Sequence, residues 1–290
     1  MTWRTVVIEN KAKLSYKNDY LIVRGEKIKT IHLSEISTII IDNTAVTLTS
    51  YLVSELLDRK IKLVFCDHQR NPQGEVLPYY GCHNSSKKIQ EQLNWDSQYS
   101  GIIWTRIIYE KIMNQANLLK EIESDRYKLL YNYLDQLTIL DETNREGHSA
   151  KIYFNTLFGM DFSREQDNDI NIMLNYGYSI LLSQFNKEIV ANGCLTQLGI
   201  KHKNEFNPFN LSSDLMEPFR PIVDRLVYEL REHTFNGNTK LQLLQLLNKK
   251  VVINDSSQYL PNAISIYVKS VIEALKNKDM NLIKFVEYEL

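Results

Sequence analysis

The chain has 290 residues, 43% hydrophobic and 24% charged, which is typical of a globular protein with one large domain or two smaller ones. With no signal-peptide pattern, no apolar run near the roughly 18 residues of a membrane span, and no paired cysteines, we expect a cytoplasmic protein with reduced thiols. A formal net charge of −1 gives nucleic-acid binding no support, so contact with DNA would need Lys and Arg gathered on one surface or a partner that extends it.

The first third of the chain is predicted to be β-structure, because short runs rich in Val, Ile, Thr and Tyr alternate with turn residues. A helical spacing of apolar residues follows at 50–59, and a buried strand is expected at 61–65. The segment 71–74 (NPQG) predicts a turn before a short strand at 75–79. The earlier strands are expected at residues 5–9, 13–16, 20–23, 27–33 and 38–41.

From about residue 84 the pattern becomes that of amphipathic helices, beginning where Asn84 and two serines could cap a helix. Strands first and helices afterwards favour two segregated domains over a βαβ alternation. We therefore expect an α+β protein, with a β-rich domain at residues 1–85 and a larger, all-helical domain at residues 86–290. The expected helical segments include residues 104–119, 170–190, 221–230, 241–247 and 263–275.

The short motifs of nucleotide-binding enzymes, serine hydrolases and zinc proteases are absent, which leaves polar residues that interrupt helical patterns. Glu146 shares a predicted helix face with Ala150, Tyr153 and Leu157, so its carboxylate is expected to be partly buried and to need a partner or a metal ion. Alternatively, Glu146 is a first-turn glutamate that the helix dipole favours.

A second candidate region follows residue 200. His202 lies between two lysines on a predicted loop, and their charges would favour the neutral imidazole that binds metal ions. Asp214 and Glu217 are three residues apart and would share a helix face, although Pro218 disfavours helical geometry at Glu217 and could itself begin a helix. Alternatively, Asp214 and Glu217 belong to a capping box and Arg220 simply pairs with a carboxylate.

Together, Glu146, Glu217 and His202 would form a site of oxygen and nitrogen ligands. Such a site suits Mg²⁺ or Mn²⁺ and differs from the thiolate sites that hold zinc. A hard cation of this kind can bind a phosphodiester oxygen, stabilise developing charge and orient an attacking hydroxyl. The residues by themselves leave other metal-assisted hydrolyses open.

Several segments occur in a fixed order along nearly the whole chain. They are residues 3–8 (WRTVVI), 64–67 (VFCD) with the 71–74 turn, 146–154 (EGHSAKIYF), 174–178 (LNYGY), the His202 loop and 210–224 (NLSSDLMEPFRPIVD). In this combination the chain resembles the CRISPR-associated integrase of spacer acquisition, Cas1, and within that family its type II-A branch.

The resemblance implies an N-terminal β domain that forms a homodimer and a C-terminal helical domain that carries the active site. It places the metal ligands at Glu146, His202 and Glu217, with Asp214 as a further catalytic acid and Mg²⁺ or Mn²⁺ as the cofactor. It also implies an endonuclease and integrase that captures a short double-stranded DNA and joins its 3′-hydroxyl ends to a CRISPR repeat by transesterification.

The expected partners are therefore double-stranded DNA, a second copy of this chain, a dimer of the small protein Cas2 and further type II-A acquisition proteins. Two other functions remain open: a stand-alone metal-dependent DNA repair nuclease, and a non-catalytic helical scaffold that binds DNA. Basic residues near the proposed ligands in sequence are expected to line the DNA path; these are Arg145, Lys151, Lys201, Lys203 and Arg220.

Overall fold

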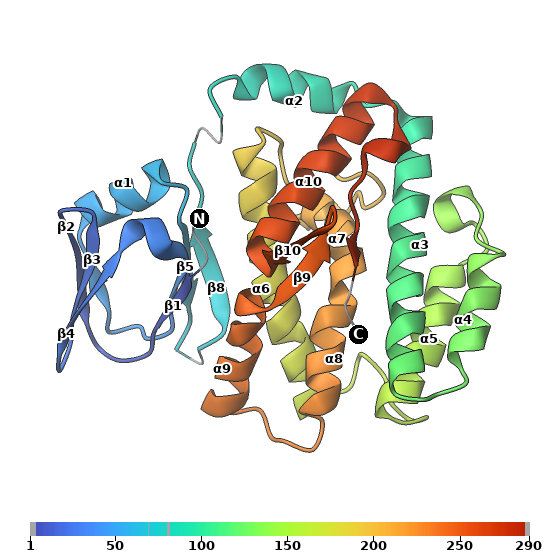
Figure 1. The fold of residues 1–290 in the computed structure, drawn as a ribbon, viewed down its shortest axis with the longest axis horizontal. Helices are drawn as coiled ribbons and strands as arrows, with labels where there is room; N and C mark the ends of the chain where they lie inside the picture. Colours follow the sequence, from blue (N-terminus) through green and yellow to red (C-terminus); the bar gives the residue numbers. More distant parts are fainter. Residues whose placement is uncertain (1–3, 69, 80–81, 288–290) are drawn as a thin grey trace.

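The computed structural model describes residues 4–68, 70–79 and 82–287, so Trp3 of the opening segment lies outside the described residues. Figure 1 shows a β-rich part, formed by the start of the chain, beside a larger part dominated by helices. The predicted α+β order is thus confirmed. The last strand of the β-rich part ends at Val76, and the next helix begins at Ser85. A domain division at residue 85 stays a prediction.

Two four-stranded sheets make up the β-rich part as far as it is described. The first has the order β1-β5-β7-β8, and β1, β5 and β7 are parallel. The second has the order β4-β3-β2-β6 and is built on antiparallel hairpins. The strands are β1 (Arg4–Ile8), β2 (Lys13–Lys17), β3 (Tyr20–Arg24), β4 (Ile28–His32), β5 (Ile36–Ile41), β6 (Thr47–Leu48), β7 (Lys62–Cys66) and β8 (Pro72–Val76).

A crossover helix, α1 (Ser50–Asp58), connects the parallel strands β5 and β7, so the exclusion of a βαβ unit was wrong for this part. Thr49 caps α1 by accepting a hydrogen bond from the backbone N–H of Leu52. Every residue of β5 is buried, as expected of a central parallel strand covered on both faces. β5 is therefore an internal strand of its sheet, between β1 and β7.

The position of β8 differs from the sequence prediction by three residues. Ahead of β8, the Asp67 carboxylate accepts a hydrogen bond from the backbone N–H of Asn71 at 2.8 Å. Pro72 and Gly74, expected in the turn, are already part of the strand. Pro72 is tolerated because β8 is the outermost strand of its sheet, where a missing N–H costs least.

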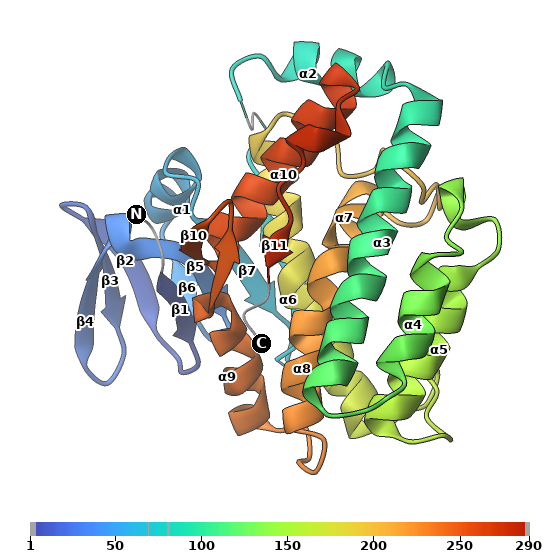
Figure 2. The same ribbon diagram turned by 45° about the vertical axis from the view of Figure 1, so that its right-hand side comes forward.

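The helical part surrounds α6, and α3 lies between the α4–α5 pair and the segment that leads into α8 (Figure 2). It is not all-helical. A three-stranded sheet, β10-β9-β11, interrupts it, and Asn254 and Asp255 form the left-handed two-residue loop of a tight hairpin. The elements are α2 (Ser85–Leu93), α3 (Ser97–Glu121), α4 (Tyr127–Leu134), α5 (Arg145–Phe158), α6 (Asp169–Ala191), α7 (Asn210–Met216), α8 (Arg220–Glu229), α9 (Gly237–Gln245), β9 (Lys250–Ile253), β10 (Ser256–Tyr259), α10 (Leu260–Asn277) and β11 (Val286–Glu287).

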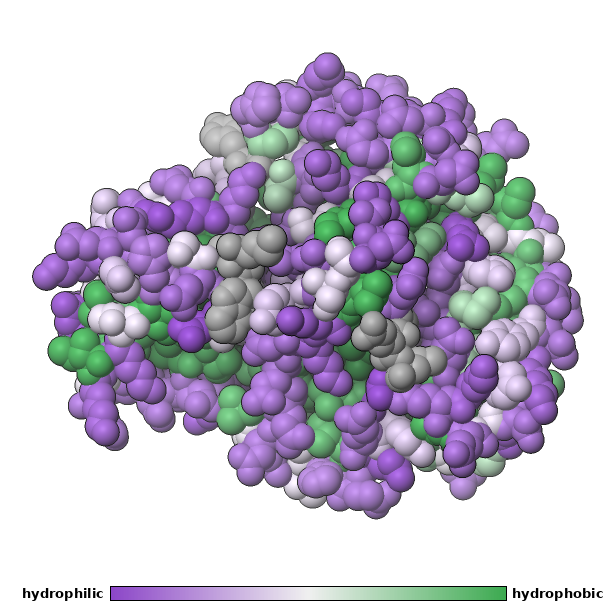
Figure 3. Space-filling view, in the orientation of Figure 1, coloured by the Kyte–Doolittle hydropathy of each residue, from purple (hydrophilic) through white to green (hydrophobic). Residues whose placement is uncertain are grey.

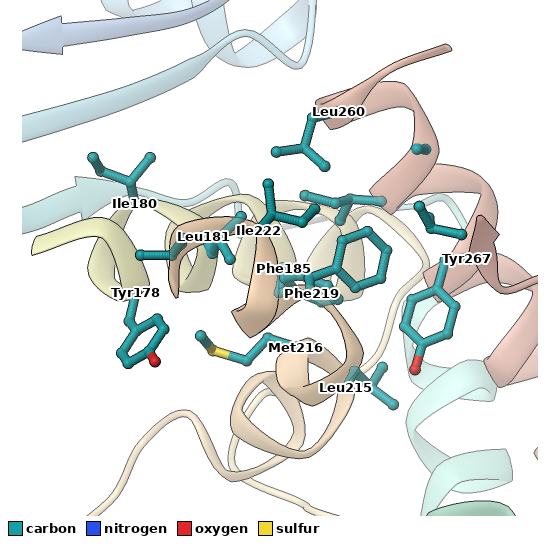
Figure 4. Packing of buried hydrophobic residues seen from close by; sticks show 14 of the residues in the cluster. Tyr178, Ile180, Leu181, Phe185, Leu215, Met216, Phe219, Ile222, Leu260 and Tyr267 are labelled. Carbon is teal, nitrogen blue, oxygen red and sulfur yellow. The ribbon is translucent and has the colours of Figure 1, made fainter. Parts of the chain in front are cut away.

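An aromatic cluster holds the centre of the helical part together. Figure 4 shows Phe185, Phe219 and Tyr267 packed together. The ring centroid of Phe219 lies 5.2 Å from that of Phe185 on α6 and 5.1 Å from that of Tyr267 on α10. All three side chains are fully buried. The outer face in Figure 3 is covered mainly by hydrophilic side chains. Among the described residues, no helix is both long and apolar enough to cross a membrane.

A buried polar network joins the β-rich part to the helical part. The Glu75 carboxylate on β8 pairs with the Lys62 ammonium on β7 at 2.5 Å and accepts a hydrogen bond from the Asn186 side chain on α6 at 2.9 Å. The Ser212 hydroxyl on α7 in turn donates to the Asn186 carbonyl at 2.5 Å. Since buried polar groups must be satisfied, this network fixes how the sheet, α6 and α7 sit against one another.

We predict that Gly177→Ala destabilises the protein by about 1–3 kcal/mol. A Cβ atom at Gly177 would lie only 2.4 Å from Cγ1 of Val223, so α6 and α8 would be forced apart. The matched control is Gly237→Ala at the start of α9, where a Cβ would meet nothing within 4 Å. Urea unfolding of both variants checks this, and equal stabilities would contradict the close packing of α6 on α8.

Candidate active site

The first candidate carboxylate, Glu146, is fixed by the start of α5. Asn144 adopts a left-handed conformation just before the helix, with φ 53°. The Asp141 carboxylate then accepts hydrogen bonds from the backbone N–H groups of Arg145 and Glu146, at 2.7 and 2.8 Å. Glu146 therefore lies in the first turn of α5, where the helix dipole favours a glutamate. Its side chain also contacts the ammonium of Lys111. Asp141 was not singled out from the sequence, since it lies before the helix that it caps.

The second candidate carboxylate, Glu217, lies where α7 passes into α8 through a short 3₁₀ turn at residues 217–219. Its backbone is helical, with φ −52° and ψ −45°, so the expected effect of Pro218 was wrong. The preference before proline is only a bias, and the buried Phe219 anchors this turn in the aromatic core. A capping box is also not formed, because Asp214 lies inside α7.

The two glutamates meet at a residue that the sequence analysis missed. The Lys111 ammonium on α3 lies 2.6 Å from Oε1 of Glu146 and 2.6 Å from Oε2 of Glu217. Arg220 donates from Nε to the other oxygen of Glu217, Oε1, at 2.8 Å. The one sequence signal for Lys111 is that it interrupts the buried apolar stripe of α3 between Ile108 and Ile112.

The electrostatics of this cluster follow from charge pairing in a buried place. Burial by itself would raise the pKa of the Glu217 carboxyl, but the adjacent Arg220 and Lys111 outweigh it and lower this pKa to about 2. Burial opposes the charge of Lys111, and the carboxylates of Glu217 and Glu146 overcome that effect and raise its pKa. Glu217, Lys111 and Arg220 are therefore all held in their charged forms.

His202 is held by Asp214, whose side chain is fully buried. The Asp214 carboxylate accepts hydrogen bonds from the backbone N–H groups of Ile200 and Lys201, at 2.6 and 3.0 Å, and from that of His202 at 3.2 Å. It also lies 2.6 Å from Nδ1 of His202. Asp214 thus shapes the 200–202 loop and orients the imidazole, as carboxylates behind metal-binding histidines commonly do.

The two neighbouring lysines do not favour the neutral form of His202, contrary to the expectation from the sequence. The hydrogen bond to Asp214 raises the imidazole pKa, although burial opposes this. The neighbouring lysines do not dominate, because side chains that are adjacent in sequence can turn apart. The Lys201 ammonium lies 5.0 Å from the ring centroid of Trp104 and 3.4 Å from the carbonyl oxygen of Leu140.

The three predicted ligands are brought together only in part. Glu146 and Glu217 converge on one point, whereas the close polar partner of His202 is Asp214. In the part of the chain that the structure describes, no three His, Cys, Asp or Glu side chains gather as a ready metal site. Oε2 of Glu217 is nevertheless buried without a well-aligned hydrogen bond, although the Lys111 ammonium lies beside it. Two oxygen donors around one cation position fit Mg²⁺ or Mn²⁺, provided that Lys111 moves away.

A groove of about 1100 Å³ opens beside His202. Lys201, Lys203, Trp95 and the exposed ring of Phe206 contribute to its walls. Two of the five basic residues expected along the DNA path therefore lie at this groove. Of the others, Lys151 is exposed, Arg145 lies over the Tyr133 ring, and Arg220 is engaged by Glu217.

A further buried carboxylate, Asp224 on α8, lies behind the cluster. It accepts hydrogen bonds from the hydroxyls of Tyr153 at 3.0 Å and of Tyr178. Burial raises the pKa of Asp224 to about 6, because these hydroxyls and Arg220 only partly compensate for lost hydration. Asp224 thus ties α5, α6 and α8 together.

We predict that the Asp224→Asn variant gains stability relative to the wild type as the pH rises. The pKa of Asp224 is higher in the folded chain than its ordinary value near 4, so its stabilising contribution is complete below about pH 4 and is lost as the pH rises through 6. Asparagine does not titrate. The free energy of unfolding of the variant minus that of the wild type should rise by up to about 3 kcal/mol between pH 4 and 7. Urea titrations measure it, and a constant difference would contradict it.

Solved structures of similar fold include a casposase bound to integration product, with TM-score 0.77 and 21% identity over 96% of this chain and 91% of that one. A partial Cas6-RT-Cas1–Cas2 complex matches with TM-score 0.67 and 19% identity over 99% of both chains. The CRISPR-associated endonuclease Cas1 of Neisseria meningitidis serogroup C (strain 8013) is 33% identical over 99% of this chain and 97% of its own length. The family model described as CRISPR associated protein Cas1 matches residues 5–240. The chain therefore belongs to the Cas1 family of CRISPR-associated proteins.

Proposed function

We propose that this chain is the metal-dependent DNA integrase and endonuclease of CRISPR adaptation, which inserts captured short duplexes into the CRISPR array. Each 3′-hydroxyl end attacks a phosphodiester of the repeat directly, without a covalent intermediate on the protein. A new phosphorus–oxygen bond forms as one ester bond of the repeat breaks, and the displaced repeat strand leaves with a free hydroxyl. The observation that carries this proposal is that Glu146 and Glu217, far apart in sequence, point their oxygens at one cation position. The name of the Neisseria relative, an endonuclease, and the integration product held by the casposase support the same chemistry.

In this proposal Glu146, Glu217 and His202 hold Mg²⁺ or Mn²⁺. When bound, the cation stabilises negative charge at the attacked phosphodiester. Glu146 and Glu217 would supply its oxygen ligands with the carboxylates that now face Lys111, and His202 would supply a nitrogen ligand through Nε2, because Nδ1 is engaged by Asp214. Asp214 therefore positions His202 in this proposal. It does not act as the catalytic acid that the family resemblance implied.

The other residues keep the two carboxylates in place. Arg220 holds one oxygen of Glu217 and stacks on the Tyr178 ring, 4.6 Å from its centroid. Asp141 fixes the turn that presents Glu146. Such preorganisation matters because carboxylates left free to turn would cost part of the binding energy when the substrate arrives.

The groove beside His202 is the proposed entry for DNA, with Lys201 and Lys203 as phosphate contacts. We further propose a homodimer, double-stranded DNA and a Cas2 dimer as partners. The partial Cas6-RT-Cas1–Cas2 complex of similar fold supports a Cas2 partner, and the casposase bound to integration product supports DNA. The homodimer rests on the sequence resemblance alone. Membership of the type II-A branch, with its further acquisition proteins, rests on the sequence resemblance alone. Since the chain is nearly neutral overall, partners that extend the basic surface would be important.

One observation favours the non-catalytic scaffold. Lys111 and Arg220 already neutralise both oxygens of Glu217, so the cluster would be electrically satisfied without a metal ion. Buried ion pairs of this kind also occur as purely structural features. A scaffold needs neither Glu146 nor a divalent cation for its activity, which gives a direct experimental distinction.

We predict that Glu146→Gln lowers strand integration by about 100-fold or more, because a cation ligand is lost, while DNA binding and folding are retained. Glu146 is the better test position because its side chain is 27% exposed. Glu217 lies between two cations, and Glu217→Gln would leave them poorly paired and cost about 3–5 kcal/mol in stability. The assay follows insertion of a labelled duplex into a repeat-bearing plasmid, with the Cas2 partner and Mn²⁺ present.

The matched control is Glu142→Gln, which changes an exposed glutamate close to Glu146 in sequence. It should integrate DNA normally. Full integration by Glu146→Gln would refute the proposed role of Glu146 as a cation ligand. A non-catalytic scaffold would be shown by wild-type protein that binds DNA but neither cuts nor joins it. Cleavage of DNA by the wild type, without joining to the repeat, would instead identify a stand-alone nuclease.

A further inference from the structure

Lys111 occupies an unusual place for a lysine. Its side chain is only 10% exposed, and its ammonium contacts one oxygen of each glutamate at 2.6 Å. These two oxygens therefore lie no farther apart than twice that distance. A cation that took one oxygen from each carboxylate would need the point where the ammonium now lies.

Each oxygen of Glu217 already contacts a cationic side chain. Its Oε1 accepts from Arg220 and its Oε2 faces Lys111, so one of the two must withdraw before a metal ion can bind. Arg220 is held by its stacking on Tyr178, whereas Lys111 carries its charge on a flexible four-carbon stem. Coulomb repulsion between a divalent cation and an ammonium in one buried place also favours the departure of Lys111.

The frame around Lys111 is held by other contacts. One turn farther along α3, the Asn114 side chain donates to the carbonyl oxygen of Pro218 at 3.0 Å. The Ser149 hydroxyl on α5 donates to the Gln115 side chain at 3.2 Å. These two contacts clamp α3 to the 217–219 turn and to α5, so the Lys111 ammonium can leave without loss of the surrounding packing.

From these contacts we infer that Lys111 is a built-in substitute cation, which keeps Glu146 and Glu217 together without metal, gives way when a divalent cation binds, and sets the affinity for it. This inference rests on the proposed metal-dependent function. Two carboxylates that face each other without a cation repel, so Lys111 stabilises the metal-free chain. The same contacts must be broken for metal binding, so Lys111 weakens it by competition.

The first test replaces Lys111 with methionine, which keeps the length of the stem and removes the charge. We expect Lys111→Met to bind Mn²⁺ about tenfold more tightly than the wild type, and to unfold at a lower temperature when Mn²⁺ is absent. Electron paramagnetic resonance of free Mn²⁺ gives the affinity, and calorimetry in a chelator gives the stability. The control Lys120→Met, at an exposed position on the same helix, should change neither.

A second test uses the wild type and does not depend on whether the variant folds. An amine-acylating reagent is applied with and without saturating Mn²⁺, and mass spectrometry follows modification at Lys111 and Lys120. Release of the ammonium should raise modification of Lys111 several-fold, because it is buried in the metal-free chain, and leave Lys120 unchanged.

The outcomes separate the two proposals. If Glu146→Gln weakens Mn²⁺ binding but Lys111→Met leaves it equal or weaker, Lys111 is not a competitor and only this inference fails. Protection of Lys111 that persists under saturating Mn²⁺ overturns it in the same way. If no Mn²⁺ binding responds to Glu146→Gln, the metal site itself is absent, and the proposed function and this inference fail together.

Discussion

The buried Glu217 carboxylate is the constraint around which the helical part is organised. A carboxylate removed from water must be paired, and the structure supplies Lys111 from α3 and Arg220 from α8. Lys111 in turn reaches Glu146 at the start of α5. One charge requirement thus draws α3, α5 and the α7–α8 junction together, and it brings two potential ligands to one place.

A second buried carboxylate, Asp214, serves the other side of the site. It turns the 200–202 loop by accepting three backbone hydrogen bonds, and it orients His202. The helix α7, which carries Asp214, also carries Ser212, whose hydroxyl donates to Asn186. Asn186 in turn contacts Glu75 of the β-rich part. The helix that supports His202 therefore also takes part in the contact between the two parts of the chain. The geometry of the proposed ligand therefore depends on packing well away from it.

The sequence predicted the regular elements best where the apolar period was long, as in α3, α6 and α10. The sequence prediction was wrong where tertiary packing overrode a local conformational preference. Pro72 marked a turn but lies in an edge strand, and Pro218 was expected to break a helical backbone that the burial of Phe219 keeps in place. The hairpin at Asn254 and Asp255 was overlooked because its strands are short.

The sequence alone determined the order of a β-rich part and a helical part, and it identified Glu146, His202, Asp214 and Glu217 as candidates, since apolar period and motif order are written along the chain. Only the tertiary structure decided what these side chains meet. It placed Lys111 between the glutamates and Asp214 behind His202. Lys111 and Glu146 are 35 residues apart, and no local sequence pattern indicates that they pair. Their burial and the distance between them are set only when the helices pack.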